Sequence, residues 1–464
     1  MYRKVIALVL CAVMVLGTCG CTATLKTTKN NTGDASEISE SASVDGTGEE
    51  GTSAENVDEK AESKDAAKET ADGTAKEGTD EATGGDVEET EGNVITEEIL
   101  SQVTSSSPEE ALEFAKNMKA GWNLGNTLDA WNKGEHNSLN SETCWSNPVT
   151  TKEMLQAVKD GGFTTVRIPV SWHNHLTEAA DGSLVIDPEW LARVKEVVDY
   201  AYDAGLYVII NIHHDNIPEG KFGYIPDEAQ EEQAKFYVNQ IWSQVAPYFK
   251  DYDEHLIFEA LNEPRLTNDS SHEWWYEASN AKCKAAARII NEMNQDFVNI
   301  VRSSGGNNVN RYLMVTGYCA SMNALKAKEY TLPEDPANYK LMISLHAYIP
   351  YDFALNPDMS LDKFDKQQAA LDFKYLTDTM NKLFLSQGVP VVLSEFGAMD
   401  KNGNLSDRVE YYNTYVSKLS AAGMPCVVWD NGFFDSGDEY FGLLDRKALN
   451  FRYPEIVDAI VSQY

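Results

Sequence analysis

Short apolar runs recur along this chain and alternate with amphipathic stretches, and this alternation most constrains the fold. Eight runs read as strands buried on both faces: 120–124, 165–170, 207–212, 256–261, 312–316, 342–346, 389–394 and 426–429. Helical periodicity of 3.6 residues occurs at 188–204, 228–245, 273–301, 366–386 and 407–422. The pattern predicts a parallel α/β sheet, most simply a closed (β/α)8 TIM barrel. A doubly wound open sheet is the alternative, but no glycine-rich phosphate loop opens a first helix.

The first 21 residues read as an export signal. Arg3 and Lys4 precede an apolar run at 5–16, which suits the core of a secretory signal peptide and is too short to span a bilayer. The run leads into GTCGC at 17–21, which resembles a bacterial lipobox, where a small residue precedes a cysteine that receives lipid. We predict that 1–21 is a lipoprotein-type signal peptide lipidated at Cys21, with Cys19 as the alternative. An ordinary signal peptide with a small-residue cleavage site is the other interpretation.

A long acidic segment follows the signal. Residues 22–93 contain six lysines against 20 acidic residues, and Thr, Ser, Ala and Gly supply most of the remainder. Such a composition cannot bury enough apolar surface to offset the entropy of ordering, so we predict that 22–97 is a disordered acidic linker. The linker would separate the following domain from a membrane. We therefore expect an exported protein, held at the bacterial cell surface by a lipid anchor or released outside the cell.

Residues 98–464 are predicted to form one domain, because no second low-complexity segment interrupts them. The whole chain has 38 Lys+Arg against 73 Asp+Glu, which gives a formal charge of −35. This acidity argues against a nucleic-acid partner, since phosphate contacts need a basic surface. It also disfavours an acidic polymer as a ligand. We expect the protein to be a monomer.

Polar and aromatic side chains end almost every apolar run, at the edge where a (β/α)8 barrel carries its active site. Packing alone does not explain them, because burying unpaired charge inside a barrel is costly. Seven of the eight runs end in such residues, namely Asn123 and Asn126, Arg167 and Trp172, His213, His214 and Asp215, Asn262 and Glu263, His346 and Tyr348, Glu395, and Trp429.

Two glutamates stand out among these residues. Glu263 ends the fourth run and Glu395 ends the seventh. An eight-stranded barrel places these runs across its mouth from one another, so the two carboxyl groups can approach. Retaining glycoside hydrolysis needs two carboxyl groups about 5–5.5 Å apart, one as nucleophile and one as acid/base. The pair predicts a glycosidase without a cofactor, since the carboxyl groups supply acid, base and nucleophile.

These residues resemble glycoside hydrolase family 5 of the cellulase superfamily, over essentially all of 100–464. The loop at 142–148 (ETCWSNP) is similar to subfamily 4, whose members are endo-β-1,4-glucanases that often also accept xyloglucan, lichenan or xylan. No catalytic position departs from the family pattern. The other matching motifs occur in the family's order: 121–128 (GWNLGNTL), 166–170 (VRIPV), 212–215 (IHHD), 261–264 (LNEP), 346–348 (HAY), 394–397 (SEFG) and 429–432 (WDNG).

The resemblance implies a role for each residue around the two glutamates. Glu395 would be the nucleophile, with the Arg167 cation beside it and Tyr348 as a hydrogen-bond donor. Glu263 would be the acid/base, which must hold a proton and later return as a base. Asn262 would bind the sugar 2-hydroxyl, a contact that strengthens in the transition state.

Three histidines belong to the same predicted site. The resemblance implies that His213 and His346 line the reacting centre and support Glu263 and the sugar hydroxyls. His214 contacts substrate or serves the structure alone. A metal ion at 213–215 (HHD) is the rival interpretation, but adjacent residues on a strand point to opposite faces and rarely chelate one ion. We predict no catalytic metal.

Aromatic rings suit sugar binding, because the apolar face of a pyranose stacks on a ring. Trp429 would form the floor of the subsite for the reacting sugar, and Trp145, in a polar loop, is the strongest candidate for a further subsite. Asn126 is also predicted to bind substrate. The remaining candidates, each of which core packing explains equally well, are Trp131, Trp172, Trp274 and Trp275.

The sequence thus predicts a retaining, endo-acting glycoside hydrolase whose partner is β-1,4-glucan, as cellulose or mixed-linkage β-glucan. A xyloglucanase, xylanase or mannanase on the same residues is one alternative, and a non-catalytic glycan-binding surface lipoprotein is the other. The four cysteines of the domain are expected to be buried thiols. One disulfide stays open as an alternative, because the chain is predicted to be exported.

Overall fold

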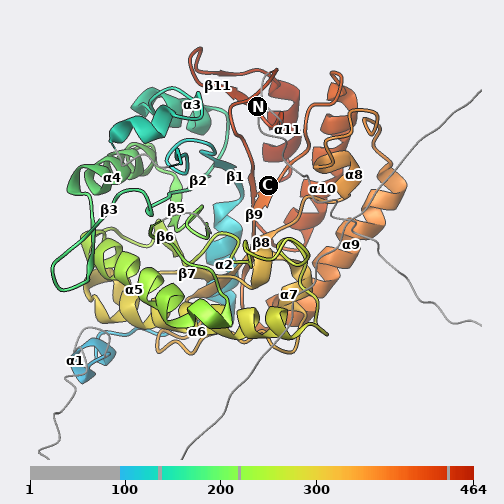
Figure 1. Cartoon of the computed structure of the whole chain (residues 1–464). Helices are drawn as coiled ribbons and strands as arrows, with labels where there is room; N and C mark the ends of the chain where they lie inside the picture. Colours follow the sequence, from blue (N-terminus) through green and yellow to red (C-terminus); the bar gives the residue numbers. More distant parts are fainter. Residues whose placement is uncertain (1–94, 134–137, 218–220, 436–438) are drawn as a thin grey trace, which may run out of the picture. The chain divides into compact units, whose positions relative to one another are not determined.

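The computed structural model describes residues 95–133, 138–217, 221–435 and 439–464. Its centre is a closed barrel in which every neighbouring pair of strands is parallel (Figure 1). The order around the ring follows the order along the chain. The barrel strands are β1 (Ala120–Asn123), β2 (Thr165–Ile168), β5 (Tyr207–Asn211), β6 (Leu256–Glu259), β7 (Leu313–Val315), β8 (Leu341–His346), β9 (Val391–Phe396) and β10 (Cys426–Val428).

The predicted (β/α)8 barrel is confirmed. Each of the eight predicted runs overlaps one barrel strand, and their ends differ by no more than about two residues, which is the usual uncertainty of strand ends. Within the described residues, two antiparallel hairpins lie outside the barrel sheet. They are formed by β3 (Leu176–Glu178) with β4 (Leu184–Ile186), and by β11 (Leu444–Asp445) with β12 (Asn450–Phe451).

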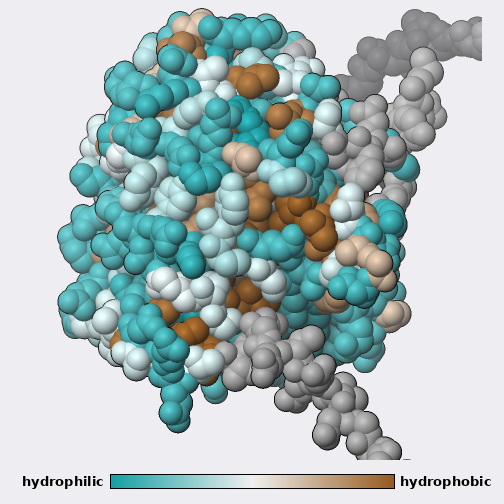
Figure 2. Space-filling view, turned by 90° about the vertical axis from the view of Figure 1, so that its left-hand side faces the viewer, coloured by the Kyte–Doolittle hydropathy of each residue, from teal (hydrophilic) through white to brown (hydrophobic). Residues whose placement is uncertain are grey.

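Helices surround the barrel and bury their apolar sides against it. The outward face that includes α4 and α5 is mainly hydrophilic, with hydrophobic side chains exposed only in limited patches (Figure 2). The longer outer helices are α3 (Lys152–Asp160), α4 (Pro188–Asp203), α5 (Glu231–Tyr248), α6 (Ala281–Ser303), α9 (Lys366–Leu383), α10 (Leu405–Ala421) and α11 (Pro454–Val461). Shorter elements are α1 (Glu97–Leu100), α7 (Met322–Leu325), α8 (Tyr351–Ala354), η2 (Leu139–Thr143), η3 (Glu228–Gln230), η4 (Gly306–Val309), η5 (Tyr318–Ala320) and η6 (Leu385–Gln387).

The prediction of a helix from residue 273 is wrong at its start. α6 begins at Ala281, because the Asn280 side chain accepts hydrogen bonds from two backbone N–H groups of the first turn. The amide Nδ2 of Asn280 also lies 2.9 Å from Nε2 of His272 and holds the preceding segment as a loop. Trp274 and Trp275 therefore lie on a loop, where they are 41% and 37% exposed.

Helix α2 (Pro108–Met118) closes the end of the barrel at which the strands begin (Figure 1). A capping box between Ser107 and Glu110 starts this helix. Phe114 stacks on Tyr312, with ring centroids 3.7 Å apart. The buried side of α2 packs against inward side chains of six strands, namely Ile209, Ile257, Met314, Met342, Val392 and Val427. This end of the barrel is thus filled by apolar groups, and polar groups are left to the other end.

The described residues can be examined for membrane-spanning helices and for disulfides. Among the described residues, no helix combines the length and the apolar character needed to cross a bilayer. The predicted signal peptide with Cys21, and the predicted linker up to residue 94, lie outside the described residues. Cys283, Cys319 and Cys426 are buried and form no disulfide, which confirms the expectation of buried thiols at these three positions.

Candidate active site

A layer of polar side chains replaces the apolar filling of the barrel near the carboxyl ends of the strands. Side chains two residues apart on a strand point to the same face, so each inward apolar residue is followed by a second inward position. On β5, β6, β8 and β9 these second inward positions are Asn211, Glu259, Ser344 and Ser394. Asn123 on β1 and Arg167 on β2 complete the polar layer, and all six side chains are buried.

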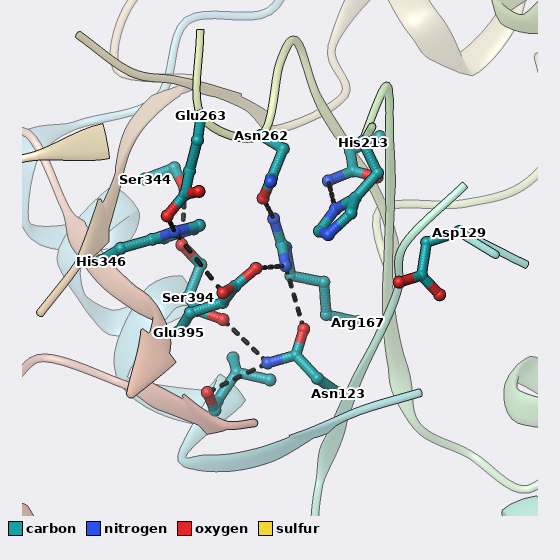
Figure 3. Close-up of polar contacts among 12 residues, drawn as sticks. Asn123, Asp129, Arg167, His213, Asn262, Glu263, Ser344, His346, Ser394 and Glu395 are labelled. Atoms are coloured by element: carbon teal, nitrogen blue, oxygen red, sulfur yellow. Dashed lines mark hydrogen bonds and ion pairs between the residues drawn. The ribbon is translucent and has the colours of Figure 1, made fainter. Parts of the chain in front are cut away.

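Arg167 lies at the centre of this layer and contacts four side chains, and Figure 3 shows its contacts with Asn123, Asn262 and Glu395. Its Nε donates to Glu259 Oε2 at 2.7 Å, and its Nη1 donates to Glu395 Oε1 at 2.6 Å. Nη1 also donates to Asn123 Oδ1 at 3.0 Å, and Nη2 donates to Asn262 Oδ1 at 2.7 Å. Burial opposes the charged form of Arg167, but the two carboxylates outweigh burial and raise its pKa, so the guanidinium stays a cation.

Glu395, on β9, receives a hydrogen bond on each of its carboxylate oxygens. Arg167 binds Oε1, and the hydroxyl of Tyr348 donates to Oε2 at 3.1 Å. His346 Nδ1 lies 3.6 Å from the same Oε2. The side chain of Glu395 is 7% exposed, which leaves a small accessible area toward the mouth of the barrel. These donors suit an ionised carboxylate held in one orientation.

Glu263 lies beyond the end of β6 and faces Glu395 (Figure 3). His346 Nδ1 lies 2.8 Å from Glu263 Oε1. One carboxylate oxygen of Glu263 and one of Glu395 lie within 4.8 Å of each other, with His346 Nδ1 within the same distance of both. Arg265 approaches from the other side, with Nη1 3.8 Å from Glu263 Oε2.

His346 and Glu263 shift each other's pKa in opposite directions. Burial acts to raise the pKa of Glu263, but His346 and Arg265 lower it below its ordinary value. Burial acts to lower the pKa of His346, but Glu395 and Glu263 raise it. These directions favour a proton on His346 Nδ1, which lies within hydrogen-bond distance of Glu263, and they couple the two groups. The proton that the predicted acid needs can therefore reside on either member of the pair.

His213, which follows β5, is a buried neutral histidine. Asn211 Nδ2 lies 3.1 Å from its Nδ1 and donates to it, so the imidazole proton resides on Nε2. Burial lowers the pKa of His213 well below its ordinary value, and the nearby His214 and Arg167 add to this effect. The His213 ring is parallel to the ring of Trp429, with centroids 5.9 Å apart. His213 can therefore donate from Nε2 without carrying charge.

The prediction that the adjacent His213 and His214 point apart is wrong. Their rings meet edge to face with centroids 4.4 Å apart, because β5 ends at Asn211 and its alternation does not continue into the loop. His214 Nε2 lies 3.5 Å from the buried carboxylate of Asp129. One ligand-type atom from each of Asp129, His213 and His214 lies within 4.8 Å of the others, and such a set could hold a divalent metal ion.

Two residues predicted to bind substrate lie in the loops after β1 and β10. Trp429, 8% exposed, packs so closely on Gly125 that an added Cβ there would lie 2.7 Å from the indole ring. Asn126 is half-buried with a left-handed φ of 56°. Its backbone N–H donates to Asp129 Oδ2 at 3.1 Å, which ties this loop to the carboxylate beside His214.

Trp145 and Trp172, two candidates for sugar binding, have different surroundings. Trp145 is half-buried, donates from Nε1 to the carbonyl of Trp131 at 2.9 Å, and lies with its ring centroid 5.6 Å from that of His214. Trp172 is 1% exposed, and its backbone N–H donates to Asp215 at 2.9 Å. Trp172 therefore belongs to the core, and Asp215 shapes the loop after β2.

Trp274 lies near Glu263, with Arg265 between them. The Arg265 guanidinium stacks on the Trp274 ring, with Cζ 3.8 Å from the ring centroid. Arg265 Nη1 also donates to the backbone carbonyl of Glu263 at 3.0 Å. One cation thus links an exposed indole to the residue that would protonate a leaving group.

Sequence reasoning missed four buried residues of the polar layer, namely Asn211, Glu259, Ser344 and Ser394. Glu259 is the most informative, because it binds Arg167 directly and is fully buried. A signal was present: Glu259 follows Ile257 by two positions in one apolar run, which places both on the same face of the strand. A charged residue at an inward position of a buried strand needs a partner, and Arg167 occupies such a position on β2.

Comparison with known proteins agrees with this geometry. Residues 128–435 match the family model described as Cellulase (glycosyl hydrolase family 5). Endoglucanase B of Ruminococcus albus is 41% identical over 369 residues, which cover 78% of this chain and 84% of that protein. Endoglucanase B of Neocallimastix patriciarum is 40% identical over 356 residues, which cover 75% of this chain and 71% of that protein.

Solved structures share the fold. A glycoside hydrolase 5 lichenase from Caldicellulosiruptor sp. F32, in complex with cellotetraose, is 46% identical with a TM-score of 0.72, and the match covers 78% of this chain and 96% of that one. A xyloglucan-specific endo-beta-1,4-glucanase from a metagenomic library, in complex with cellotriose, is 37% identical with a TM-score of 0.69, over 77% of this chain and 100% of that one.

Proposed function

Since this chain belongs to glycosyl hydrolase family 5, we propose that it is an endo-acting β-1,4-glucanase that hydrolyses with retention of configuration. The observation that carries this proposal is the approach of Glu263 and Glu395, whose nearest carboxylate oxygens lie within 4.8 Å. Retaining glycosidases hold their carboxyl groups about 5–5.5 Å apart, whereas inverting ones leave about 6.5–9.5 Å for a water molecule. The short separation fits direct attack by a carboxylate.

In the first step, Glu395 attacks the anomeric carbon while the glycosidic bond breaks and Glu263 protonates the leaving oxygen. The attack converts Glu395 into an ester and removes the negative charge that stabilises the His346 cation. The proton therefore passes from His346 Nδ1 to Glu263 as the bond breaks. In the second step, Glu263 takes a proton from water, which opens the ester and releases the sugar.

The layer beneath the pair holds the substrate donors in place. Arg167 fixes Asn262 by binding its Oδ1, so the amide Nδ2 is the group of Asn262 that can donate to the sugar 2-hydroxyl. Arg167 and Tyr348 together orient Glu395 for attack. Preorganised donors of this kind cost no reorganisation at the moment of reaction.

The aromatic residues divide between the two sides of the scissile bond. Glu263 protonates the leaving group, so the departing sugars lie on its side, where Arg265 holds the exposed Trp274. Trp429 and Trp145 serve the side of the sugar that stays on the enzyme, since Trp429 lies against His213 and Trp145 near His214. Stacking on these rings suits a neutral glucan, which needs no charge attraction to an acidic protein.

The central test removes each carboxylate without changing its size. Glu263→Gln and Glu395→Gln should each lower hydrolysis of carboxymethyl-cellulose and barley β-glucan by about 10³-fold or more, because each residue makes or breaks a bond. Glu113→Gln, which makes the same substitution at an exposed glutamate of α2, is the matched control and should keep its activity. Near wild-type activity in either glutamate variant would defeat the assignment.

The preferred substrate can be identified by measuring hydrolysis of a panel of five polysaccharides. We expect cellulose and mixed-linkage β-glucan to be the main substrates, with products of intermediate length early in the reaction. Xyloglucan is the second candidate, because of the 37% identity to a xyloglucan-specific relative. Xylan and mannan complete the panel, and sizing of early products separates endo action from release at chain ends. Absence of product from all five polymers would favour a glycan-binding lipoprotein instead.

We also propose that the protein is exported and anchored by lipid at Cys21, on the strength of the apolar run at 5–16 and the small residue before this cysteine. Radiolabelled palmitate should enter the wild-type protein and the Cys19→Ser variant but not the Cys21→Ser variant. Label that persists when both cysteines are replaced would rule out the anchor. The monomeric state stays a prediction, for which light scattering of the protein without residues 1–21 is the measurement.

A further inference from the structure

Glu259 is a third carboxylate, fully buried beneath the two catalytic glutamates, and the proposed mechanism does not use it. Its Oε2 accepts from Arg167 Nε at 2.7 Å and from Asn211 Nδ2 at 2.9 Å. Its Oε1 accepts from the Ser344 hydroxyl, which also contacts Ser394. Every carboxylate contact is therefore directed inside the barrel, and Glu259 does not face the substrate.

The charge of Arg167 is shared between two carboxylates, so its effect on Glu395 depends on Glu259 as well. Arg167 supplies one positive charge between two carboxylates, Glu259 at Nε and Glu395 at Nη1. A cation shared by two anions leaves Glu395 with excess negative charge, whereas a cation paired with Glu395 alone would form a neutral and less nucleophilic pair. The guanidinium is planar, so anchoring Nε also sets where Nη1 and Nη2 point.

We propose that Glu259 is a positioning residue of the reaction: it anchors Arg167 and takes up part of its charge, so that Glu395 stays oriented and nucleophilic. This inference rests on the proposed function, because it concerns the nucleophile of the same site. Several charged and titratable groups face Arg167 and Glu395. They are Glu259 on β6, Glu263 beyond the end of β6, His346 at the end of β8, and His213 and Tyr348 in the loops.

Glu259→Gln tests the charge while keeping the shape. The glutamine carbonyl can accept from Arg167 and Asn211, and its amide can donate to Ser344, which then donates to Ser394. With Glu259 neutral, the whole charge of Arg167 acts on Glu395. The acidic limb of the kcat/KM profile on barley β-glucan should move to lower pH by about one unit, and kcat/KM at its optimum should fall by about 10-fold or more.

Ser344→Ala is the matched control, because it removes a hydrogen bond to Glu259 and keeps the charge. Its acidic limb should coincide with that of the wild type even where its stability is lower. Titration with a 2-deoxy-2-fluoro-cellobioside, which traps the nucleophile, counts the competent sites in each preparation. An unmoved limb in Glu259→Gln, with an active wild type, overturns the inference, whereas an inactive wild type overturns the proposed function.

A second variant pair covers the case in which Glu259→Gln does not fold. Arg167→Gln leaves Glu259 as a buried unpaired charge, which is strongly destabilising. Adding Glu259→Gln to Arg167→Gln should therefore raise the melting temperature above that of Arg167→Gln alone. A double variant that melts at a lower temperature than Arg167→Gln would show that Glu259 does not act through Arg167, and would overturn the inference.

Discussion

At the scale of single residues, the Glu263–His346 pair determines how the activity depends on pH. The pKa of His346 is raised above its ordinary value of about 6.5, so its protonated form persists to higher pH. The proton available for the leaving group is lost only as pH rises through this raised pKa. The basic limb of kcat/KM on soluble β-glucan should therefore lie above about pH 6.5. A limb below that pH, measured on the wild-type enzyme, would contradict the assignment of the proton to this pair.

Tyr348 offers a second residue-scale prediction. Tyr348→Phe removes the hydroxyl that donates to Glu395 Oε2 at 3.1 Å. One such hydrogen bond contributes about 1–1.5 kcal/mol, so kcat/KM should fall by about 10-fold. Tyr415→Phe is the control, since it removes a hydroxyl that donates to the carbonyl of Ala347 and leaves Glu395 untouched. Equal loss in both variants would show that Tyr348 acts through stability alone.

At the scale of elements, α2 stabilises the barrel by covering the apolar side chains of six strands. Phe114 stacks on Tyr312 at the bottom of the barrel and is 9% exposed. Phe114→Ala should lower the free energy of unfolding by about 3–5 kcal/mol, because it removes the ring and leaves a cavity. Phe236→Ala, at a position 43% exposed on α5, should change it by less than about 0.5 kcal/mol. Denaturant unfolding followed by tryptophan fluorescence measures both, and similar values would contradict the role of α2.

The loops after the strands show how elements limit sequence-based inference. The helical pattern at 273–301 includes Trp274 and Trp275, yet the Asn280 cap starts the helix eight residues later. A cap that competes with helical periodicity is a local hydrogen-bond choice, which periodicity does not register. The prediction that His213 and His214 point to opposite faces was wrong for a related reason, because the alternation of side chains ends where β5 ends.

At the scale of the whole molecule, the described barrel contains every residue of the proposed site. Removing residues 1–94 keeps α1 and α2. The shortened protein should hydrolyse soluble β-glucan with a kcat/KM within about twofold of the full-length chain, since the predicted linker would add reach rather than contacts. Removing residues 1–119 also deletes α2 and should lower the melting temperature markedly. A large loss of activity in the first truncation would contradict the predicted independence of the domain.

Much of this molecule could be predicted from the order of its residues. Alternation of apolar runs and helical patterns is local, so the eight strands, the closed barrel and the polar strand ends were predicted correctly. The two glutamates, Arg167, His346 and Tyr348 were predicted as neighbours, and the structure brings them together. Composition alone distinguished the acidic segment at 22–97 from the domain, a division that stays a prediction.

Which polar side chains pair inside the barrel was decided only when the barrel closed. Arg167 binds Glu259 and Glu395, which lie 92 and 228 residues away along the chain. The alternation of residues along a strand shows that such side chains face inward. It does not show which atoms come into contact, because the distances between side chains of different strands depend on how the eight strands tilt and close. The same closure buried Trp172, brought His213 beside Trp429, and brought His346 Nδ1 to 2.8 Å from Glu263 Oε1. Sequence periodicity thus sets the face of each side chain, and the low-dielectric interior formed on folding sets its charge and its partner.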